Sequence, residues 1–263
     1  MKVMIYCFTG TGNSLLMARK IANQLEDAEI KPVWKLLEEK AQESIIQQGA
    51  EAIGFIFPVY CDRVPQIVKK SIEEAQFHNI KYCFGVTTSG GSAGNALYEL
   101  DGILKSKGIR LDYGKNIDLS DNSIVIRTSE EKALIRFGKT DMAAKEIAQQ
   151  VNLRKTLKEP FKKKLSYSIM GKVSKNILIK YYKINHKKID TTRCKNCKLC
   201  INICPVQNIT TKEGVISFGG NCEQCFACIN WCPEKAIIFG KIDPKKRSQY
   251  HCPGIYAKDI KGF

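Results

Sequence analysis

The chain has 263 residues, which is enough for one large domain or two smaller ones, and a formal net charge of +16 at pH 7. No run of ~18 apolar residues occurs, and residues 1–8 are a short apolar run, so we expect neither a membrane-spanning helix nor a signal peptide. The excess positive charge lies mainly in residues 151–193 and beyond residue 240, without the aromatic platforms or reader motifs of nucleic-acid binding.

The first predicted element is a buried parallel strand at residues 2–8, a short apolar run. The loop T-G-T-G-N-S follows, and apolar residues then recur at helical spacing from Leu15 to Leu25. A strand, a loop of glycine and hydroxyl residues, and a helix form a phosphate cradle, because N–H groups at the helix start point at the anion. The candidate ligands are the six loop residues Thr9, Gly10, Thr11, Gly12, Asn13 and Ser14.

This loop differs from the two common nucleotide motifs. It lacks the Gly-Lys-Ser/Thr of a P-loop, and Leu15 stands where the dinucleotide fingerprint has its third glycine. Its polar side chains suit a terminal phosphate monoester better than a pyrophosphate. The sequence T-G-T-G-N-S resembles the FMN-phosphate loop of flavodoxins, and the alternative is a plain turn between strand and helix.

Residues 29–36 predict a weaker second strand, and the apolar run at residues 52–57 predicts a buried third one. The third strand ends at Pro58, Val59 and Tyr60. Ligands of open α/β sheets bind beyond the carboxyl ends of strands, and the resemblance to flavodoxins implies that this loop packs on the isoalloxazine ring. Tyr60 is the candidate stacking residue, and the alternative is a surface tyrosine in a proline-bounded loop.

A second glycine-rich loop, T-T-S-G-G-S-A-G-N at residues 87–95, follows a predicted helix at 66–76 and a predicted fourth strand at 81–86. Glycines let the backbone approach a flat ring, and free N–H groups can bond the polar edge of a flavin. Residues 121–123, after a fifth predicted strand at 109–119, are further candidates for flavin contact. The candidate flavin ligands in the glycine-rich loop are Thr88, Ser89, Gly90, Gly91 and Asn95, and the alternative is a flexible loop.

Five predicted strands alternate with helices, and no hairpin signal separates them, which predicts a parallel sheet with right-handed crossovers. Ser129 is expected to cap a long helix that runs to about residue 158. With candidate flavin loops after strands one, three and four, the expected fold is an α/β flavodoxin-like, doubly wound sheet of order 2-1-3-4-5.

The connector at residues 161–190 is rich in lysine, and its apolar residues recur at mostly i, i+4 spacing, which predicts one or two amphipathic helices. Three roles remain open. The connector packs between two domains, or it lies on an anionic membrane surface, or it docks an acidic redox partner through charge complementarity.

Two copies of Cys-x2-Cys-x2-Cys-x3-Cys-Pro occupy residues 194–205 and 222–233, at a fixed offset of 28 residues (194 to 222, 204 to 232). This is the bacterial spacing of [4Fe–4S] ligands. Zinc is the alternative, but it has no use for a third cysteine at i+6 or for the Cys-Pro pair. Clustered ligand cysteines also indicate a reducing cytosol, so we expect a cytoplasmic protein.

In two-cluster ferredoxins the fourth thiolate of each cluster comes from the other motif. One cluster should therefore be held by Cys194, Cys197, Cys200 and Cys232, and the other by Cys222, Cys225, Cys228 and Cys204. Apolar residues between the motifs should sheathe the clusters. Cys252 stands alone in the tail and is not expected to be a ligand.

Taken whole, the chain resembles a fusion family of anaerobes in which a flavodoxin-like domain precedes a small α+β bacterial-type ferredoxin domain with two [4Fe–4S] clusters. The expected divisions are an FMN domain at 1–158, the connector at 159–190, the ferredoxin domain at 191–240 and a basic tail at 241–263. The resemblance implies a cytoplasmic electron carrier between the clusters and FMN. The alternative is an FMN-dependent oxidoreductase that reduces a quinone, oxygen or a flavin.

No catalytic acid–base residue is predicted, because the three histidines lie outside the flavin loops. No nicotinamide site is predicted, because the sequence has no second nucleotide motif. The expected partners are low-potential, acidic redox proteins, as donor or acceptor. A homodimer and peripheral membrane contact are left open.

Overall fold

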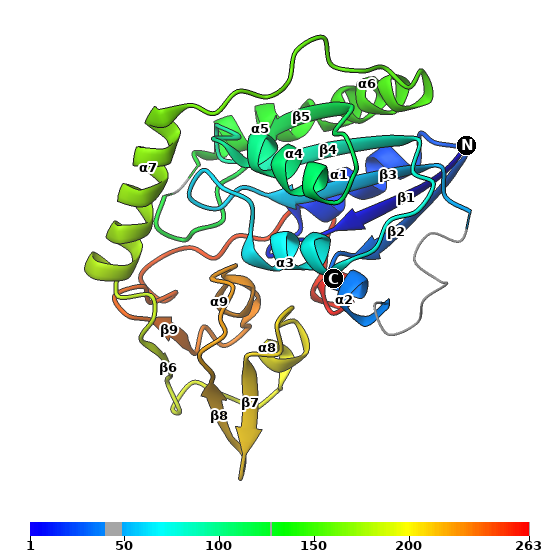
Figure 1. Ribbon diagram of the computed structural model, residues 1–263. Coiled ribbons are helices and arrows are strands. Elements are labelled where there is room, and N and C mark those ends of the chain that lie inside the picture. The colour runs from blue at the N-terminus through cyan, green and yellow to red at the C-terminus, as the bar shows by residue number, and fades with distance from the viewer. Residues whose placement is uncertain (40–48, 127, 263) are drawn as a thin grey trace.

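The computed structural model describes residues 1–39, 49–126 and 128–262 (Figure 1). Its centre is a parallel sheet of order β2-β1-β3-β4-β5, as the sequence predicts. Every residue of β3 and β4 is buried, because helices cover both faces of a central parallel strand. The strands are β1 (Lys2–Cys7), β2 (Asp27–Pro32), β3 (Ala52–Pro58), β4 (Tyr82–Ser89) and β5 (Tyr113–Asp118).

Pairs of helices cover the sheet: α1 packs with α6, and α3 packs with α4. Each crossover between neighbouring parallel strands carries its helix onto one of the two faces. This arrangement is the flavodoxin-like, doubly wound fold. The helices of this part are α1 (Asn13–Ala22), α2 (Lys35–Glu39), α3 (Gln66–Glu74), α4 (Ala96–Ser106), α5 (Glu130–Gly138) and α6 (Thr140–Asn152).

Three predicted elements have different bounds in the structure. The long helix expected up to residue 158 is two helices, α5 and α6, although Ser129 does cap the first by accepting a hydrogen bond from the Lys132 N–H. At the break, the Thr140 hydroxyl donates a hydrogen bond to the Phe137 carbonyl oxygen. In a continuous helix this carbonyl would accept a backbone N–H instead. The second strand ends at Pro32 rather than 36, because the chain turns there into α2. The fifth begins at Tyr113 rather than 109.

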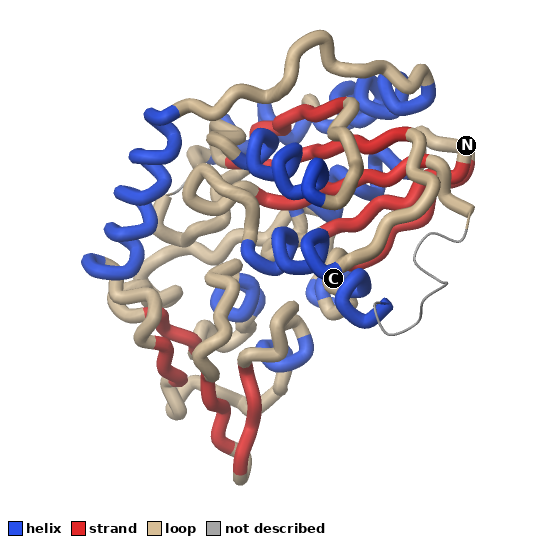
Figure 2. Tube along the Cα trace, viewed as in Figure 1, coloured by secondary structure: helices blue, strands red, loops and turns tan. Residues whose placement is uncertain are grey.

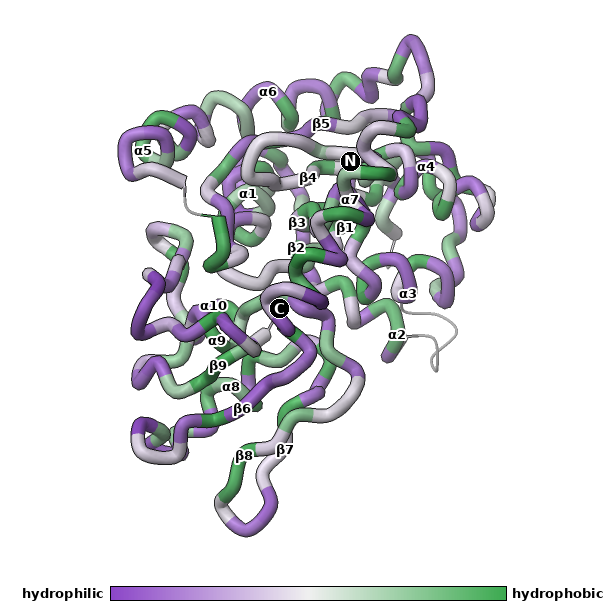
Figure 3. Tube along the Cα trace, turned by 90° about the vertical axis from the view of Figure 1, so that its left-hand side faces the viewer, coloured by the Kyte–Doolittle hydropathy of each residue, from purple (hydrophilic) through white to green (hydrophobic). Residues whose placement is uncertain are grey.

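The connector forms α7 (Leu165–Asn176), one turn of π-helix (Ile177–Tyr181) and β6 (Lys187–Ile189). Figure 1 shows α7 along the outer edge of the molecule, and Figure 3 turns that side to the viewer. None of the helices in the described ranges has the length and apolar character that crossing a bilayer requires.

The C-terminal part is built from two similar halves. The first half holds α8 (Leu199–Asn202) and the hairpin β7 (Ile209–Lys212) and β8 (Val215–Phe218), and the second holds α9 (Ala227–Trp231) and β9 (Ile237–Phe239). The strand β9 pairs with β6 of the connector in an antiparallel ladder of three residues (Figure 2). The predicted repeat extends to the backbone, because left-handed residues recur 28 apart at Asn196/Gln224, Lys198/Phe226 and Gln207/Lys235.

The two parts share one hydrophobic core. Ile203, Ala227 and Trp231 of the cysteine-rich part are buried in the same apolar cluster as the central strands. Cys252, Ile255 and Ile260 of the tail, the last in α10 (Ala257–Ile260), belong to it as well. The predicted divisions at residues 158, 190 and 240 stay predictions, because a shared core does not mark a boundary.

Candidate redox centres

Two cavities in the C-terminal part are each lined by four cysteines. Cys194, Cys197, Cys200 and Cys232 line one, and Cys204, Cys222, Cys225 and Cys228 line the other. Each group takes three cysteines from one motif and the fourth from its repeat, which is the grouping that the spacing predicts. In the described part of the chain no three His, Cys, Asp or Glu side chains converge tightly enough for a single metal ion, and the cysteines ring a cavity instead.

Backbone N–H groups point at the cysteine sulfurs in both halves. The Asn208 N–H donates to Cys204 Sγ at 3.2 Å, and the Ala236 N–H, 28 residues on, donates to Cys232 Sγ at 3.3 Å. Such bonds stabilise negative charge on sulfur and tune the potential of a cluster. Burial raises the pKa of the Cys200 thiol to about 11, which favours the protonated thiol in the metal-free chain. A bound metal would supply the positive charge that favours the thiolate instead. The donor set therefore fits an iron–sulfur cluster in each cavity.

The predicted flavin loops meet at a third cavity. Val59 and Tyr60 line it from the loop after β3, and Ser89, Gly90 and Gly91 line it from the loop after β4. Residues 121–123, after β5, line it too. The remaining wall comes from the second cysteine motif, with Glu223, Gln224 and Phe226, and from the connector, with Ser174, Ile177 and Leu178. We call this space the ring cavity.

Three predicted flavin ligands lie elsewhere. Pro58 and Thr88 are buried at the ends of β3 and β4 and do not line the ring cavity. Asn95 fixes the start of α7, because its amide bonds the Lys164 backbone at both N–H and C=O and donates to the Ser168 hydroxyl.

Tyr60 is only half-buried, and its ring packs edge-on against Phe8 with centroids 6.1 Å apart. Its hydroxyl points back toward Gly10, 3.2 Å from the place a Cβ would take there. Burial raises the pKa of this phenol well above its ordinary value, so Tyr60 stays neutral. The side chain thus links the ring cavity to the predicted phosphate loop.

The predicted phosphate loop is buried and leads directly into α1. Gly12 adopts φ +104°, which only glycine reaches easily, and its N–H donates to Thr9 Oγ1 at 3.0 Å. The Ser14 hydroxyl bonds that of Thr88 at 2.8 Å. Thr11 Oγ1 is buried and has no hydrogen-bond partner among the residues the structure describes. An unpaired buried hydroxyl costs ~1–3 kcal/mol, so this loop fits a ligand with strong acceptor oxygens, such as a phosphate.

The C-terminal part lies directly against the phosphate loop. The Trp231 indole N–H donates to the Gly10 carbonyl at 3.0 Å, and the Cys252 N–H donates to the Thr11 carbonyl at 2.9 Å. A Cβ on Gly10 would stand 2.5 Å from the Cys225 carbonyl oxygen. Sequence reasoning missed Trp231 and gave Cys252 no role, because nothing in the local pattern links them to residues more than 200 positions away.

Glu223 joins the second cysteine motif to α3. Its carboxylate accepts hydrogen bonds from the N–H groups of Gln66, at 2.7 Å, and Ile67, at 3.0 Å. The N-cap residue of α3, Pro65, offers no side-chain hydrogen bond of its own, so Glu223 caps this helix from the other part of the molecule. Burial raises the pKa of Glu223 to about 7.

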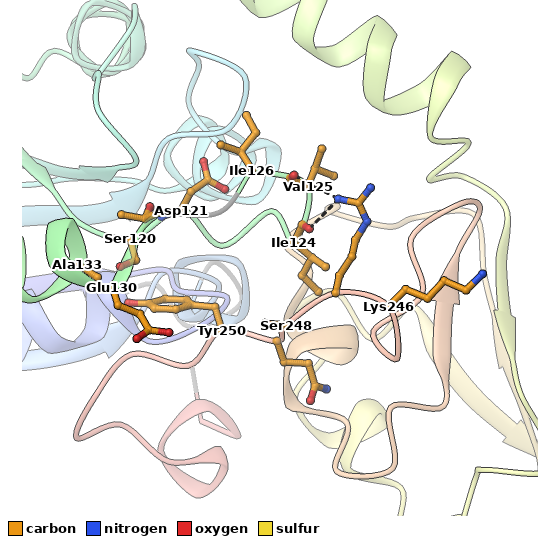
Figure 4. Close-up of a pocket in the computed structure, with 13 residues that line it drawn as sticks. Ser120, Asp121, Ile124, Val125, Ile126, Glu130, Ala133, Lys246, Ser248 and Tyr250 are labelled. Atoms are coloured by element: carbon orange, nitrogen blue, oxygen red, sulfur yellow. Dashed lines mark hydrogen bonds between the residues drawn. The ribbon is translucent and has the colours of Figure 1, made fainter.

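A fourth cavity, of about 420 Å³, lies between the loop after β5 and the tail. Asp121 and Ile126 line it from the loop, and Tyr250 lines it from the tail, whereas the amine end of Lys246 points away from the loop (Figure 4). It shares Asp121, Val125 and Ile126 with the ring cavity, so the two spaces adjoin. The Tyr250 hydroxyl donates to Asn13 Oδ1 at 2.7 Å, which brings this cavity next to the phosphate loop.

Residues 186–254 match the family model of the 4Fe-4S dicluster domain, which makes this part of the chain an iron–sulfur domain. No protein with a curated description matches the chain. Several solved structures are similar to the sheet domain: a flavoprotein in complex with FMN from Lactobacillus acidophilus (14% identity, 44% of this chain and 92% of that one, TM-score 0.34), an NAD(P)H:quinone oxidoreductase from Methanothermobacter marburgensis (13%, 56% and 96%, 0.38), and an FMN-dependent NADH-azoreductase from Bacillus anthracis (11%, 56% and 100%, 0.37).

Likenesses at these identities and TM-scores assign no activity. The chain does combine a flavodoxin-like sheet with an iron–sulfur domain. This combination belongs to electron-transfer and oxidoreductase chemistry.

Proposed function

We propose that the protein relays electrons between two [4Fe–4S] clusters and one FMN. The observation that carries the proposal is the shared wall of the ring cavity, where Glu223, Gln224 and Phe226 of the second cysteine motif face the two predicted flavin loops. A cluster bound by this motif and a flavin bound by these loops would be neighbours within one chain. Intramolecular transfer would then need no docking step.

The cluster ligands in this proposal are the two sets of four cysteines that line the two cavities. The phosphate of FMN would lie on Thr9–Ser14, with the Thr11 hydroxyl supplying the unpaired donor, and the ring would lie in the ring cavity beside Tyr60. When bound, FMN couples one-electron and two-electron transfer, which the clusters alone do not do. The chain itself positions the cofactors, excludes water with its shared core and bonds the cluster sulfurs.

The two cysteine sets lie in different surroundings. The set that contains Cys225 lies against the phosphate loop and the ring cavity. The other set contains Cys197, which is exposed. We propose that external electrons are exchanged at the Cys197 side, with a low-potential redox protein, and reach the flavin through the Cys225 side.

A second function is favoured by the fourth cavity. Its volume of about 420 Å³ suits a small molecule, and it adjoins the ring cavity. The protein would then pass electrons from FMN to a small acceptor. None of the histidines, all of which the structure describes, lines either cavity, so protons would come from other groups or from solvent.

Anaerobic reconstitution followed by stopped-flow spectroscopy tests the relay. The loaded protein should hold ~8 iron atoms and one FMN per chain. When a low-potential donor reduces the clusters, the flavin absorbance should bleach without any added acceptor. Iron near four, or a flavin that stays oxidised beside reduced clusters, would refute the relay. A bleached flavin that reoxidises only when a small acceptor is added would instead support the enzyme.

A further inference from the structure

The helix α7 and the π-turn after it present large apolar side chains to solvent. The exposed fractions range from 48% to 72% for the set that we call the α7 face: Leu165, Ile169, Met170, Val173, Ile177 and Tyr181. Five of them follow i, i+4 spacing, at 165, 169, 173, 177 and 181, which places them on one side of the helix. The sequence predicts this stripe. These six side chains face outward, whereas Leu178, Ile179 and Ile184 of the same connector pack in an apolar cluster with Phe226 and Ile237 of the cysteine-rich part. Packing of the connector between the two parts therefore stays a prediction.

The other side of α7 is held against the protein. Gly171 is buried, and a Cβ there would overlap the carbonyl oxygen of Cys61, so the helix backbone lies directly on the loop after β3. Asn95 fixes the first turn through Lys164 and Ser168. These contacts orient the helix, and α7 cannot turn to bury its apolar face without breaking them.

The charge along the connector itself has one sign, although Asp62 of the loop after β3 lies against the buried side of α7. Lysines 162, 163, 164, 172, 175 and 180 are all exposed, and no Asp or Glu occurs between Glu159 and Asp190. Exposed aliphatic residues with lysines beside them are typical of helices that lie in the surface of an anionic membrane. A second copy would bring two cationic faces together, which like-charge repulsion opposes. An acidic protein would satisfy the lysines, but the aliphatic row from Leu165 to Ile177, which carries no polar group in its side chains, suits acyl chains better.

We propose that the α7 face docks the protein on an anionic lipid surface. The helix lies at the outer edge of the molecule, where a flat surface can reach it (Figures 1 and 3). Ile177 of this face also lines the ring cavity, together with Ile126, which is 66% exposed. Docking therefore brings the rim of the ring cavity to the lipid surface.

Vesicle flotation of the reconstituted full chain tests the proposal. The protein should float with vesicles of phosphatidylcholine and phosphatidylglycerol, bind vesicles of phosphatidylcholine alone much more weakly, and detach as salt screens the lysines. Val173→Glu should weaken binding about tenfold or more, since it places a charge in the apolar layer. Lys172→Gln should weaken binding about fivefold, because one lysine near an anionic surface contributes about 1 kcal/mol of binding free energy.

The matched control is Leu134→Glu on α5, which changes an apolar residue that is 73% exposed but lies outside the α7 face. This variant should float like the parent. All three sites are exposed, so cluster absorbance and melting temperature should not change. Equal flotation of Val173→Glu and Leu134→Glu would overturn the proposal. Failure to bind anionic vesicles would also overturn it. In that case, a dimer that Val173→Glu splits in light scattering would assign the face to a second copy, and an acidic redox protein that no longer binds Val173→Glu would assign it to that protein.

Discussion

Glu223 provides the most direct test of how the iron–sulfur part is held against the sheet domain. Its carboxylate accepts the N–H groups of Gln66 and Ile67 at 2.7 and 3.0 Å, at the start of a helix that has no side-chain cap of its own. Glu223→Ala removes both bonds and leaves two N–H groups without acceptors. A hydrogen bond to a charged group contributes ~1.5–3 kcal/mol, and a helix cap contributes ~0.5–2 kcal/mol.

Burial raises the pKa of this carboxyl to about 7, so burial opposes its charge. We therefore take a value near the lower end of the ~1.5–3 kcal/mol for a hydrogen bond to a charged group. A loss of about 2 kcal/mol corresponds to about a 30-fold smaller equilibrium constant for docking. Hydrogen exchange at about pH 8, where the carboxylate is ionised, should show protection at the start of α3 falling by that factor. Intramolecular electron transfer should slow in parallel, while the iron content stays constant.

Glu234→Ala is the matched control, because Glu234 is an exposed glutamate beside the other cysteine set. It should leave the exchange of α3 unchanged. If both variants exchange alike at Gln66 and Ile67, the inter-domain cap is wrong. If Glu223→Ala loses iron, the residue acts on the cluster and not on docking.

Three further substitutions test other contacts. Cys204→Ser should halve the iron from ~8 to ~4 per chain, whereas Cys252→Ser, buried but outside both sets, should keep all of it in an iron assay; equal losses would contradict the grouping. Thr11→Val should weaken FMN binding ~10- to 100-fold, measured by fluorescence quenching, yet raise the melting temperature of the flavin-free protein, because it removes an unpaired buried hydroxyl; a lower melting temperature would show that the hydroxyl has a structural partner. Gly171→Ala should lower the free energy of unfolding by ~1–3 kcal/mol in urea titrations, whereas Gly138→Ala, where a Cβ meets open space, should not.

The middle of the sheet could be predicted because β1, β3 and β4 are buried on both faces, whereas the half-exposed edge strands β2 and β5 have weaker patterns and different bounds. A strand such as β3 must then be apolar at nearly every position, and that run is visible in the sequence without any partner. The cysteine groups were predictable for a similar reason. The geometry of a cluster fixes the spacing of its ligands, so the pattern survives in one dimension.

The contacts by which the cysteine-rich part and the tail cover the predicted phosphate loop could not be predicted. Trp231 meets Gly10, and Tyr250 meets Asn13, across more than 200 residues of chain. One indole or one phenol carries no periodicity that would name its partner. The break between α5 and α6 was missed because a threonine hydroxyl bonding a carbonyl three residues back has no distinct sequence signal. The connector could be predicted only in part. Its spacing predicts an apolar stripe on α7, but spacing does not show which surface, if any, covers that stripe.

The tail crosses the phosphate loop, and this contact has a consequence for how the protein is made. Thr11 and Gly12 leave the ribosome long before Cys252 and Ile255, which later contact them. The contacts that cover this loop cannot form while the rest of the chain is being synthesised, so the loop stays open during that time. The proposed FMN would reach the open loop freely during this interval, whereas FMN added to the finished chain would have to wait for the tail to open. Flavin loading should accordingly be fast during translation and slow afterwards.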